Sequence, residues 1–411
     1  MTATALQQEE HLPEAIVCKW CGKSFHYLKS HISMGRCENI PESAKGLDVD
    51  EVVKMYTSAF PDEPTISRTA LAKLNEKRAE KHSGEGKVAE ISAHPGYAGT
   101  VEYKTELVAA HELLGVTIKE LGTPRGKPLQ VTVNVNTPYP EFLPEAKKNY
   151  VYGDFDLIKD IFMMLEIGIP GYLWGHAGTG KSSLPTQLCA LLNRPLIRAQ
   201  HTASMEEAHV TGQILARDGS TYFEPGLLAL AMKNGWVYLA DEYDFAFPQI
   251  LGVYQPVLEG EPLIIKEATP DWRRITPHKR FAFIGTGNTN GSGDETGLYQ
   301  GTNIQNAANF SRFGIVSNVK YMSTKAEVNM LAEAGVIREY AEKMVKFANL
   351  VREGYEQHLI SQPIGPRELL LSAKIGMMRG DFSAGIEKSF INKLPSTSAQ
   401  AAREVVQKIF G

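Results

Sequence analysis

The sequence predicts an α/β protein with a parallel sheet wrapped by helices, a helical C-terminal domain and a small N-terminal Cys/His module. Three observations support this prediction. Short apolar strands alternate with helical segments from about residue 146, the run from Thr324 to Phe410 keeps a mostly helical period, and three of the four cysteines lie in the first forty residues. Such alternation is typical of a parallel sheet that helices cover on both faces.

The composition is that of an ordinary globular protein. The chain has 411 residues, 43% of them hydrophobic and 22% charged, with a net charge of −4. These values exclude collagen-like, low-complexity and wholly disordered chains, and they exclude a strongly basic nucleic-acid binder. The N-terminal run MTATALQQEEHLP has no basic start and no apolar core, and Glu166 and Pro170 break the most apolar window. We therefore expect no signal peptide and no membrane-spanning helix.

The first cysteines form a pattern that suits a metal. Cys18, Cys21, His31 and Cys37 give the spacing C-x₂-C-x₉-H-x₅-C. Thiolates and an imidazole at such spacing suit tetrahedral Zn²⁺, with His26 as an alternative fourth ligand. The competing interpretation is a chance cluster of free thiols. A metal site in a reducing compartment fits this crowding better than a disulfide framework, so we expect a cytoplasmic protein.

The Cys/His module is also locally basic, through Lys19, Lys23, Lys29 and Arg36. This charge permits nucleic-acid contact, but such modules equally serve as docks for proteins, and we do not favour a nucleic-acid role. We expect the zinc-finger-like module to span residues 1–45 and a helical region with a linker to span 46–145. Within the latter, the spacing predicts helices over 47–60 and 107–121, a solvated helix and linker over 67–90, and a strand over 129–135.

A complete phosphate-binding motif follows the strand candidate at residues 171–174. The motif G-x-x-x-x-G-K-[ST] is matched by Gly175, His176, Ala177, Gly178, Thr179, Gly180, Lys181 and Ser182. Glycines let backbone N–H groups turn toward phosphate oxygens, and the helix that follows adds its positive end. We expect Lys181 to reach the β and γ phosphates and Ser182 to hold Mg²⁺. The strand–loop–helix context argues against a chance glycine-rich turn.

Two adjacent acids follow the apolar strand candidate at residues 236–240. Asp241 and Glu242 stand directly after it, sixty residues beyond the phosphate motif. A carboxylate there can bind Mg²⁺, and a second one can polarise the attacking water. An apolar run that ends in two acids is often a plain strand end. Beside a phosphate loop, we interpret Asp241 as the Mg²⁺ ligand and Glu242 as the catalytic base.

Three further polar residues occupy positions where ring ATPases place catalytic groups. Asn288 closely follows the strand candidate at 281–285, where an amide can contact the γ-phosphate or the attacking water; a simple Asn-Gly turn is the alternative. Arg312 follows a helical run and precedes a small strand candidate, where an arginine can reach a neighbouring subunit. Arg367 begins a helix after a proline, where it can contact nucleotide from a lid domain. A surface arginine and a structural helix-start residue are the respective alternatives.

With these residues in order, the chain resembles an AAA+ ATPase of the MoxR-like group, and within it the CobS-type ATPase subunit of aerobic cobaltochelatase. The segments GHAGTGKSS, ADEYDFAFPQI and GDETGLYQGT bear the resemblance, which spans residues 146–411. It implies an AAA+ core over 146–322 and a helical lid over 323–411. It also implies the family's roles for Gly175 to Ser183, for the two acids, and for Asn288, Arg312 and Arg367.

The resemblance further implies ATP and Mg²⁺, a hexameric ring with one nucleotide at each subunit interface, and a partner protein with a VWA domain. We therefore expect an ATP-hydrolysing ring that remodels a partner protein. The alternative is a nucleic-acid-associated ring ATPase that its zinc finger anchors. A third possibility is a scaffold that binds nucleotide only as a switch, but the intact set of Lys181, Glu242 and Arg312 argues against it.

Overall fold

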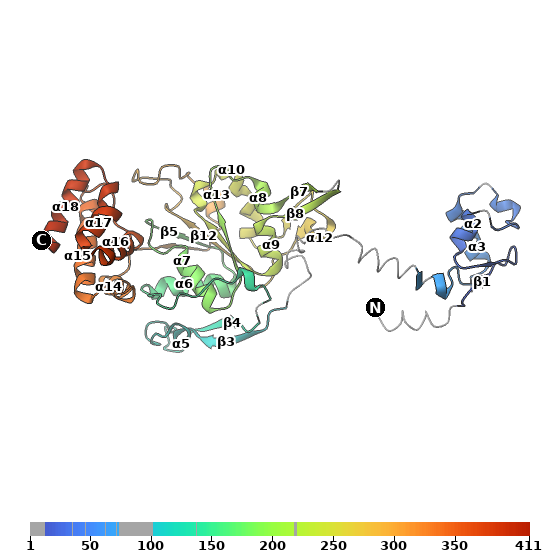
Figure 1. Cartoon of the computed structure of the whole chain (residues 1–411), viewed down its shortest axis with the longest axis horizontal. Coiled ribbons are helices and arrows are strands. Elements are labelled where there is room, and N and C mark those ends of the chain that lie inside the picture. The colour runs from blue at the N-terminus through green and yellow to red at the C-terminus, as the bar shows by residue number, and fades with distance from the viewer. Residues whose placement is uncertain are drawn as a thin grey trace. The chain divides into compact units, whose positions relative to one another are not determined.

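The computed structural model describes residues 13–34, 36–45, 47–61, 63–70, 72–73, 102–136, 138–217 and 220–411. Contacts divide the chain into two units, Met1–His94 and Pro95–Gly411 (Figure 1). Hydrophobic clusters lie within each unit. Most of the solvated helix and linker expected over 67–90 lies outside the described residues.

In the N-terminal unit a hairpin and two helices surround a small core. Strand β1 (Ile16–Val17) pairs antiparallel with β2 (Ser24–Phe25), and α2 (Leu28–Ser33), η1 (Glu42–Ala44) and α3 (Val49–Ala59) follow. The helix predicted over 47–60 is therefore present, and the Asp48 side chain caps it by accepting from two backbone N–H groups. Helix α3 buries Val52 and Tyr56 in the same core as Leu28. A module with so few apolar residues needs this helix for its core, so the packing extends past residue 45.

The second unit is built on a five-stranded sheet. Its order is β13-β5-β12-β9-β6, and all four pairings are parallel. The strands are β5 (Gly171–Trp174), β6 (Leu196–Gln200), β9 (Val237–Asp241), β12 (Ala282–Gly287) and β13 (Ile315–Asn318). The sequence predicted four of these strands and missed β6. Because the strands are parallel, their carboxyl ends meet at one edge of the sheet, and this edge positions the site.

Each face of the sheet has its own core. Alternate residues of β9 belong to different clusters: Tyr238 packs with Leu228, and Leu239 packs with Leu188 and Ile158. Helices α6 (Phe155–Ile167) and α7 (Ser183–Leu191) therefore cover one face, and α9 (Leu227–Asn234) covers the other. The sheet is consequently buried on both faces, as its apolar strands predict.

Short elements connect this framework, and the sequence reading missed most of them. One is an antiparallel hairpin of β7 (Gly212–Arg217) and β8 (Ser220–Pro225) after α8 (Glu207–Thr211). The others are η4 (Tyr243–Phe245), α10 (Pro248–Leu251), η5 (Gly252–Tyr254), α11 (Gln255–Leu258), β10 (Leu263–Ile264), α12 (Pro270–Arg273), β11 (Arg274–Ile275) and α13 (Ala307–Phe310).

The segment before the sheet corrects one prediction. The helix expected over 107–121 is wrong in its extent: β3 (Thr105–Ala109) is a strand, and α5 covers only Ala110–Leu114. Strand β3 pairs antiparallel with β4 (Gln130–Asn134), where a strand was expected, and η3 (Pro140–Phe142) follows. The pairing with β4 outweighs the local helical spacing, and Gly115 in the left-handed conformation ends the helix.

The C-terminal region is helical, as its period predicts. It comprises α14 (Thr324–Glu333), α15 (Arg338–Glu356), α16 (Pro366–Arg379), α17 (Phe382–Ser389), η6 (Ile391–Lys393) and α18 (Ser396–Phe410). These helices gather at one end of the second unit, in orange and red in Figure 1, around a separate apolar core. A buried ion pair joins Arg352 on α15 to Glu327 on α14 at 2.7 Å. The described helices include none with the length and hydropathy of a bilayer-spanning segment.

Candidate functional site

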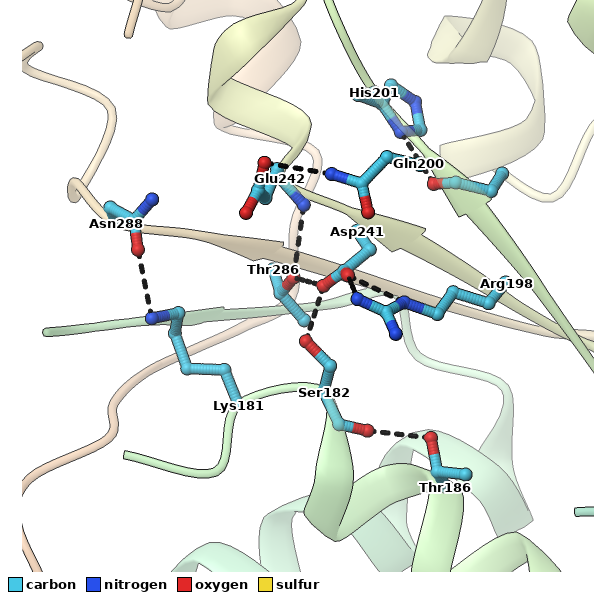
Figure 2. Close-up of polar contacts among 11 residues, drawn as sticks. Lys181, Ser182, Thr186, Arg198, Gln200, His201, Asp241, Glu242, Thr286 and Asn288 are labelled. Carbon is cyan, nitrogen blue, oxygen red and sulfur yellow. Dashed lines mark hydrogen bonds and ion pairs between the residues drawn. The ribbon is translucent and has the colours of Figure 1, made fainter. Parts of the chain in front are cut away.

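The phosphate-binding motif forms the loop between β5 and α7. Gly175 has a φ of 146°, and a Cβ there would lie 2.5 Å from the Val319 carbonyl oxygen, so only glycine fits. Lys181 Nζ donates to the carbonyl oxygens of Gly175 at 2.7 Å and His176 at 2.9 Å. It also donates to Asn288 Oδ1 at 3.1 Å (Figure 2). Lys181, which was predicted to bind phosphate, is thus in direct contact with Asn288, which was predicted to lie at the tip of its strand.

Burial and charge act in opposite directions on Lys181. Burial lowers the pKa of its ammonium group to about 8, while Asp244, Asp241 and Glu242 favour the charged form. The group therefore stays mostly protonated at neutral pH, and it loses little further hydration when it meets an anion. Such a cation is suited to phosphate oxygens.

Asp241 ends β9 as a buried carboxylate with a full set of donors. Its Oδ1 accepts from the hydroxyls of Ser182 and Thr286, and its Oδ2 accepts from Arg198, whose Nε lies 2.7 Å away (Figure 2). Burial alone would raise the pKa of Asp241, but these hydrogen bonds hold it below its usual value. The acid is therefore ionised, and Ser182 and Asp241 present hard oxygen atoms side by side, which suits Mg²⁺.

Glu242 follows in an unusual backbone conformation, with φ 53° and ψ 43°. Its N–H donates to Thr286 Oγ1 at 3.3 Å, and its Oε2 accepts from Gln200 Nε2 at 2.8 Å (Figure 2). Burial, then the charges of Asp241 and Asp244, raise the pKa of Glu242. A raised pKa makes a carboxylate a better proton acceptor, which fits the role of a base.

Asn288 is fixed through its backbone. Its N–H and that of Thr289 donate to Asp244 Oδ2 at 2.8 and 2.9 Å, and the Thr289 hydroxyl donates to the same oxygen. Asp244 is fully buried. The Asp-Glu-Tyr-Asp segment therefore holds the end of β12 as well as supplying the two acids.

A second contact braces the phosphate loop from the GDETGLYQGT segment. The Tyr299 hydroxyl accepts from the Ala177 N–H at 3.1 Å and lies 2.9 Å from His176 Nδ1. Tyr321 stacks on the His176 ring at 5.8 Å between centroids. The loop is thus held from outside the motif itself.

These side chains open into one pocket of about 1280 Å³, large enough for a nucleotide. Its lining includes the phosphate loop, the two acids, Asn288 and Arg367, together with Tyr150, Tyr152, Met330 and Leu370. Arg367 lies on α16, whose first turn packs on the loop: a Cβ on Gly178 would lie 3.5 Å from the Arg367 Cβ. The predicted lid arginine therefore lies at the site.

Arg312 lies apart from the others. It is absent from the described lining of this pocket. Its Nε donates to Glu259 Oε1 at 2.7 Å, and its Nη1 donates to the Ala308 carbonyl. The lining therefore brings together Ala177 to Ser183, the two acids, Asn288 and Arg367, while Gly175 and His176 stand just before it in the loop and Arg312 lies elsewhere.

The sequence reading missed the partners of the acids, Arg198, Gln200 and Thr286. The first two lie on β6, where exposed Arg198 and Gln200 alternate with buried Ile197 and Ala199. That alternation is a strand signal, and the polar positions share one face. Thr286 stands two residues before Asn288 on a strand that was predicted, but no local pattern marks its hydroxyl.

The four predicted zinc ligands come together in the N-terminal unit. The ligand atoms of Cys18, Cys21, His31 and Cys37 all lie within 4.8 Å of one another. Cys18 Sγ and Cys37 Sγ are 3.8 Å apart, and Cys21 Sγ lies 3.3 Å from His31 Nε2. Zn–S bonds of ~2.3 Å at tetrahedral angles would put sulfur atoms ~3.8 Å apart, so the donors fit zinc. His26, the alternative ligand, instead contacts the Glu14 carbonyl and Ser67.

Comparison with known proteins identifies the second unit. Residues 172–302 match the AAA domain of the dynein-related subfamily. The chain is 32% identical over 249 residues to the aerobic cobaltochelatase subunit CobS of Sinorhizobium sp., covering 58% of this chain and 74% of the relative. The chain belongs to the CobS-type AAA+ ATPases. It is therefore an ATPase, and the family assignment implies ATP and Mg²⁺ at the pocket just described.

More distant similarities were also found. An uncharacterized protein of Staphylococcus aureus is 23% identical over 265 residues, which span 62% of this chain and 96% of that protein. Among solved structures, a Cytophaga hutchinsonii ATPase covers 63% of this chain and 90% of its own, at 13% identity and a TM-score of 0.35. A mutant RuvB of Thermotoga maritima covers 64% of this chain and 73% of its own, at 12% identity and a TM-score of 0.38.

Proposed function

We propose that this CobS-type ATPase works as a homo-oligomeric ring, hexameric like the rings that the resemblance implies, and that it uses ATP hydrolysis to remodel a partner protein. The observation that bears most on this proposal is the division of the predicted catalytic residues. Lys181, Asp241, Glu242 and Asn288 converge on one pocket, while Arg312 is held away from it. A site that lacks its arginine within the subunit can receive one from a neighbour.

In the proposed reaction, Lys181 and the loop N–H groups bind the phosphate oxygens of ATP. Ser182 and Asp241 would hold Mg²⁺, which supplies positive charge to those oxygens. Glu242 accepts a proton from the attacking water, and Asn288 orients that water or the γ-phosphate. Arg367 contacts the nucleotide from α16, and Arg312 of the adjacent subunit stabilises negative charge in the transition state.

The proposed division of labour follows the two halves of the second unit. Residues 146–322 form the AAA+ core and residues 323–411 form a helical lid, and the lining of the pocket draws on both. A nucleotide in this pocket would contact both halves, so binding and release can change their relative position. Through this movement the ring would do mechanical work on its partner protein.

For the partner, we propose a VWA-domain protein, on the basis of the CobS resemblance. The N-terminal unit would carry a structural zinc and serve as a protein dock. Its basic residues are largely neutralised: Lys19 pairs with Glu63 at 2.7 Å, Lys29 pairs with Asp50 at 2.6 Å, and Lys23 pairs with Glu38. This pairing weakens the alternative of nucleic-acid anchoring. The zinc thiolates favour a reducing compartment, so we place the protein in the cytoplasm.

Two variants test the nucleotide site. Lys181→Ala removes the main phosphate-binding cation and should abolish binding of a fluorescent ATP analogue. Glu242→Gln keeps the Mg²⁺ ligand and removes the base, so it should bind the analogue and fail to hydrolyse ATP. Lys388→Ala, on α17, is the matched lysine control, and it should bind the analogue and hydrolyse ATP like wild type. Equal nucleotide affinity in wild type and Lys181→Ala would refute the assignment.

A further inference from the structure

One buried hydroxyl lies between the two acids of the site. Strands β12 and β9 pair in parallel with Gly285 opposite Ala240, so the next residues, Thr286 and Asp241, are also neighbours. Thr286 is 1% exposed. Its Oγ1 lies 2.5 Å from Asp241 Oδ1 and 3.3 Å from the Glu242 backbone nitrogen (Figure 2). A single side chain therefore contacts both acids.

The chemistry of the partners fixes the direction of these hydrogen bonds. An ionised carboxylate can only accept, and a backbone N–H can only donate. The Thr286 hydroxyl must therefore give its proton to Asp241 and accept from Glu242. No rotation of the hydroxyl satisfies both partners in another way, so the side chain is locked in one orientation.

The backbone of Glu242 explains why such a lock is needed. Its φ of 53° lies in the left-handed region, which residues other than glycine, asparagine and aspartate rarely adopt. The N–H that Thr286 accepts belongs to this same residue, and Gln200 holds the carboxylate at the other end. The two contacts together determine where the Glu242 carboxylate stands relative to Asp241.

We propose that Thr286 is a positioning residue for ATP hydrolysis: its hydroxyl aligns the metal-binding acid Asp241 with the base Glu242. This inference rests on the proposed roles of those two acids. Thr286 does not act on the nucleotide itself. It acts by holding Oδ1 of Asp241 toward Ser182 and by fixing the backbone from which Glu242 reaches into the pocket.

The test compares Thr286→Val, which keeps the shape and removes the hydroxyl, with Thr286→Ser, which keeps the hydroxyl. Thr286→Val should lower kcat by roughly 10- to 100-fold while KM for ATP changes by less than about 3-fold, because misplaced catalytic groups slow the chemical step more than binding. It should also raise the Mg²⁺ concentration needed for half-maximal rate. Thr286→Ser should stay within about 3-fold of wild type in all three quantities.

Two results would overturn the proposal. One is a wild-type kcat in Thr286→Val. The other is an equal loss in the valine and serine variants, because the variant that keeps the hydroxyl would then be no more active than the variant that lacks it. If Thr286→Val does not fold, as judged by thermal melting, Thr286→Cys takes its place, and equal kcat in the cysteine and serine variants would then contradict the role.

The same preparations separate this proposal from the proposed function. If Glu242→Gln hydrolyses ATP like wild type, the assignment of the base fails whatever Thr286 does. If Glu242→Gln is inactive and Thr286→Val is fully active, only the positioning role fails. Adding Thr286→Val to Glu242→Gln should change the residual rate by much less than it changes the wild-type rate, because the base that it positions is already absent.

Discussion

At the scale of single residues, Arg312 is held in one direction by contacts outside the nucleotide pocket of its own chain. Glu259 accepts from Nε at 2.7 Å, and the Ala308 carbonyl accepts from Nη1, so the guanidinium has a fixed direction. The side chain remains one-quarter exposed. A fixed, partly exposed arginine outside its own pocket is suited to meet a neighbouring subunit.

We predict that Arg312→Ala binds ATP with near-normal affinity and hydrolyses it ~10³-fold more slowly, because an arginine finger acts mainly on the transition state. Glu259→Gln should reduce the hydrolysis rate less, since it weakens the hydrogen bond that orients the Arg312 guanidinium and leaves the charge of that group unchanged. Arg338→Ala, exposed on α15, is the control. Hydrolysis at the wild-type rate in Arg312→Ala would show that the arginine has no such role.

His201, next to Gln200, is buried, and both of its ring nitrogens have polar partners. Its Nδ1 contacts the Ala199 carbonyl at 3.0 Å and its Nε2 contacts the Tyr254 hydroxyl at 2.8 Å, an arrangement that the neutral ring satisfies. Burial lowers the pKa of His201 to about 4. The unfolded chain takes up a proton near pH 6.5 and the folded protein does not, so the free energy of unfolding falls as pH drops through this window.

We therefore expect the lowered pKa of His201 to reduce the free energy of unfolding by about 2 kcal/mol as the pH falls from 7 to 5. The drop in Tm over that interval should be smaller in His201→Asn than in wild type. His358→Asn, at an exposed position, should follow the wild-type curve. Parallel curves for wild type and His201→Asn would show that the histidine does not titrate in this way.

At the scale of elements, we propose that the N-terminal hairpin and helix depend on a bound metal for their stability. Strands β1 and β2 have two residues each and α2 has six, which is too little secondary structure to be stable alone. The core that α3 adds is small, and four potential ligands lie at its edge. Zinc would therefore supply much of the folding free energy of this unit.

We predict about one zinc per chain by metal analysis, lost when Cys18→Ser and Cys21→Ser are combined. Chelation should make the N-terminal unit sensitive to protease while the second unit stays intact. His26→Ala is the matched control, because His26 lies in the same unit and outside the cluster, so zinc should be retained. A zinc-free preparation whose N-terminal proteolysis is unchanged by chelation would contradict the metal site.

At the scale of the whole molecule, the proposed ring can be tested by mixing two inactive variants. Glu242→Gln lacks the base but offers an intact Arg312, and Arg312→Ala lacks the finger but offers an intact Glu242. If the arginine acts across a head-to-tail interface, a mixed ring contains some sites with both groups, and hydrolysis should partly recover. Native mass spectrometry must show that mixed rings form. Mixed rings without any recovery would instead favour a role for Arg312 in its own subunit.

The sequence by itself determined the parts of this protein that are local in the chain. Gly175 to Ser182 form a phosphate loop because glycines, a preceding strand and a following helix stand next to one another. The segment around Asp241 is similar, since its apolar strand directly precedes the two acids. The same holds for the spacing of Cys18, Cys21, His31 and Cys37. Short-range steric and periodic rules are sufficient for such segments.

Only the tertiary structure decided how those parts are held. Arg198 and Gln200 reach the acids because β6 pairs with β9, and Thr286 reaches them because β12 pairs on the other side. Strand β3 forms because β4 pairs with it, against the helical spacing of its own residues. These contacts join residues 21 to 45 positions apart in the chain. Pairing partners and the direction of a buried hydroxyl are set by the packed sheet, so no local pattern in the sequence could have specified them.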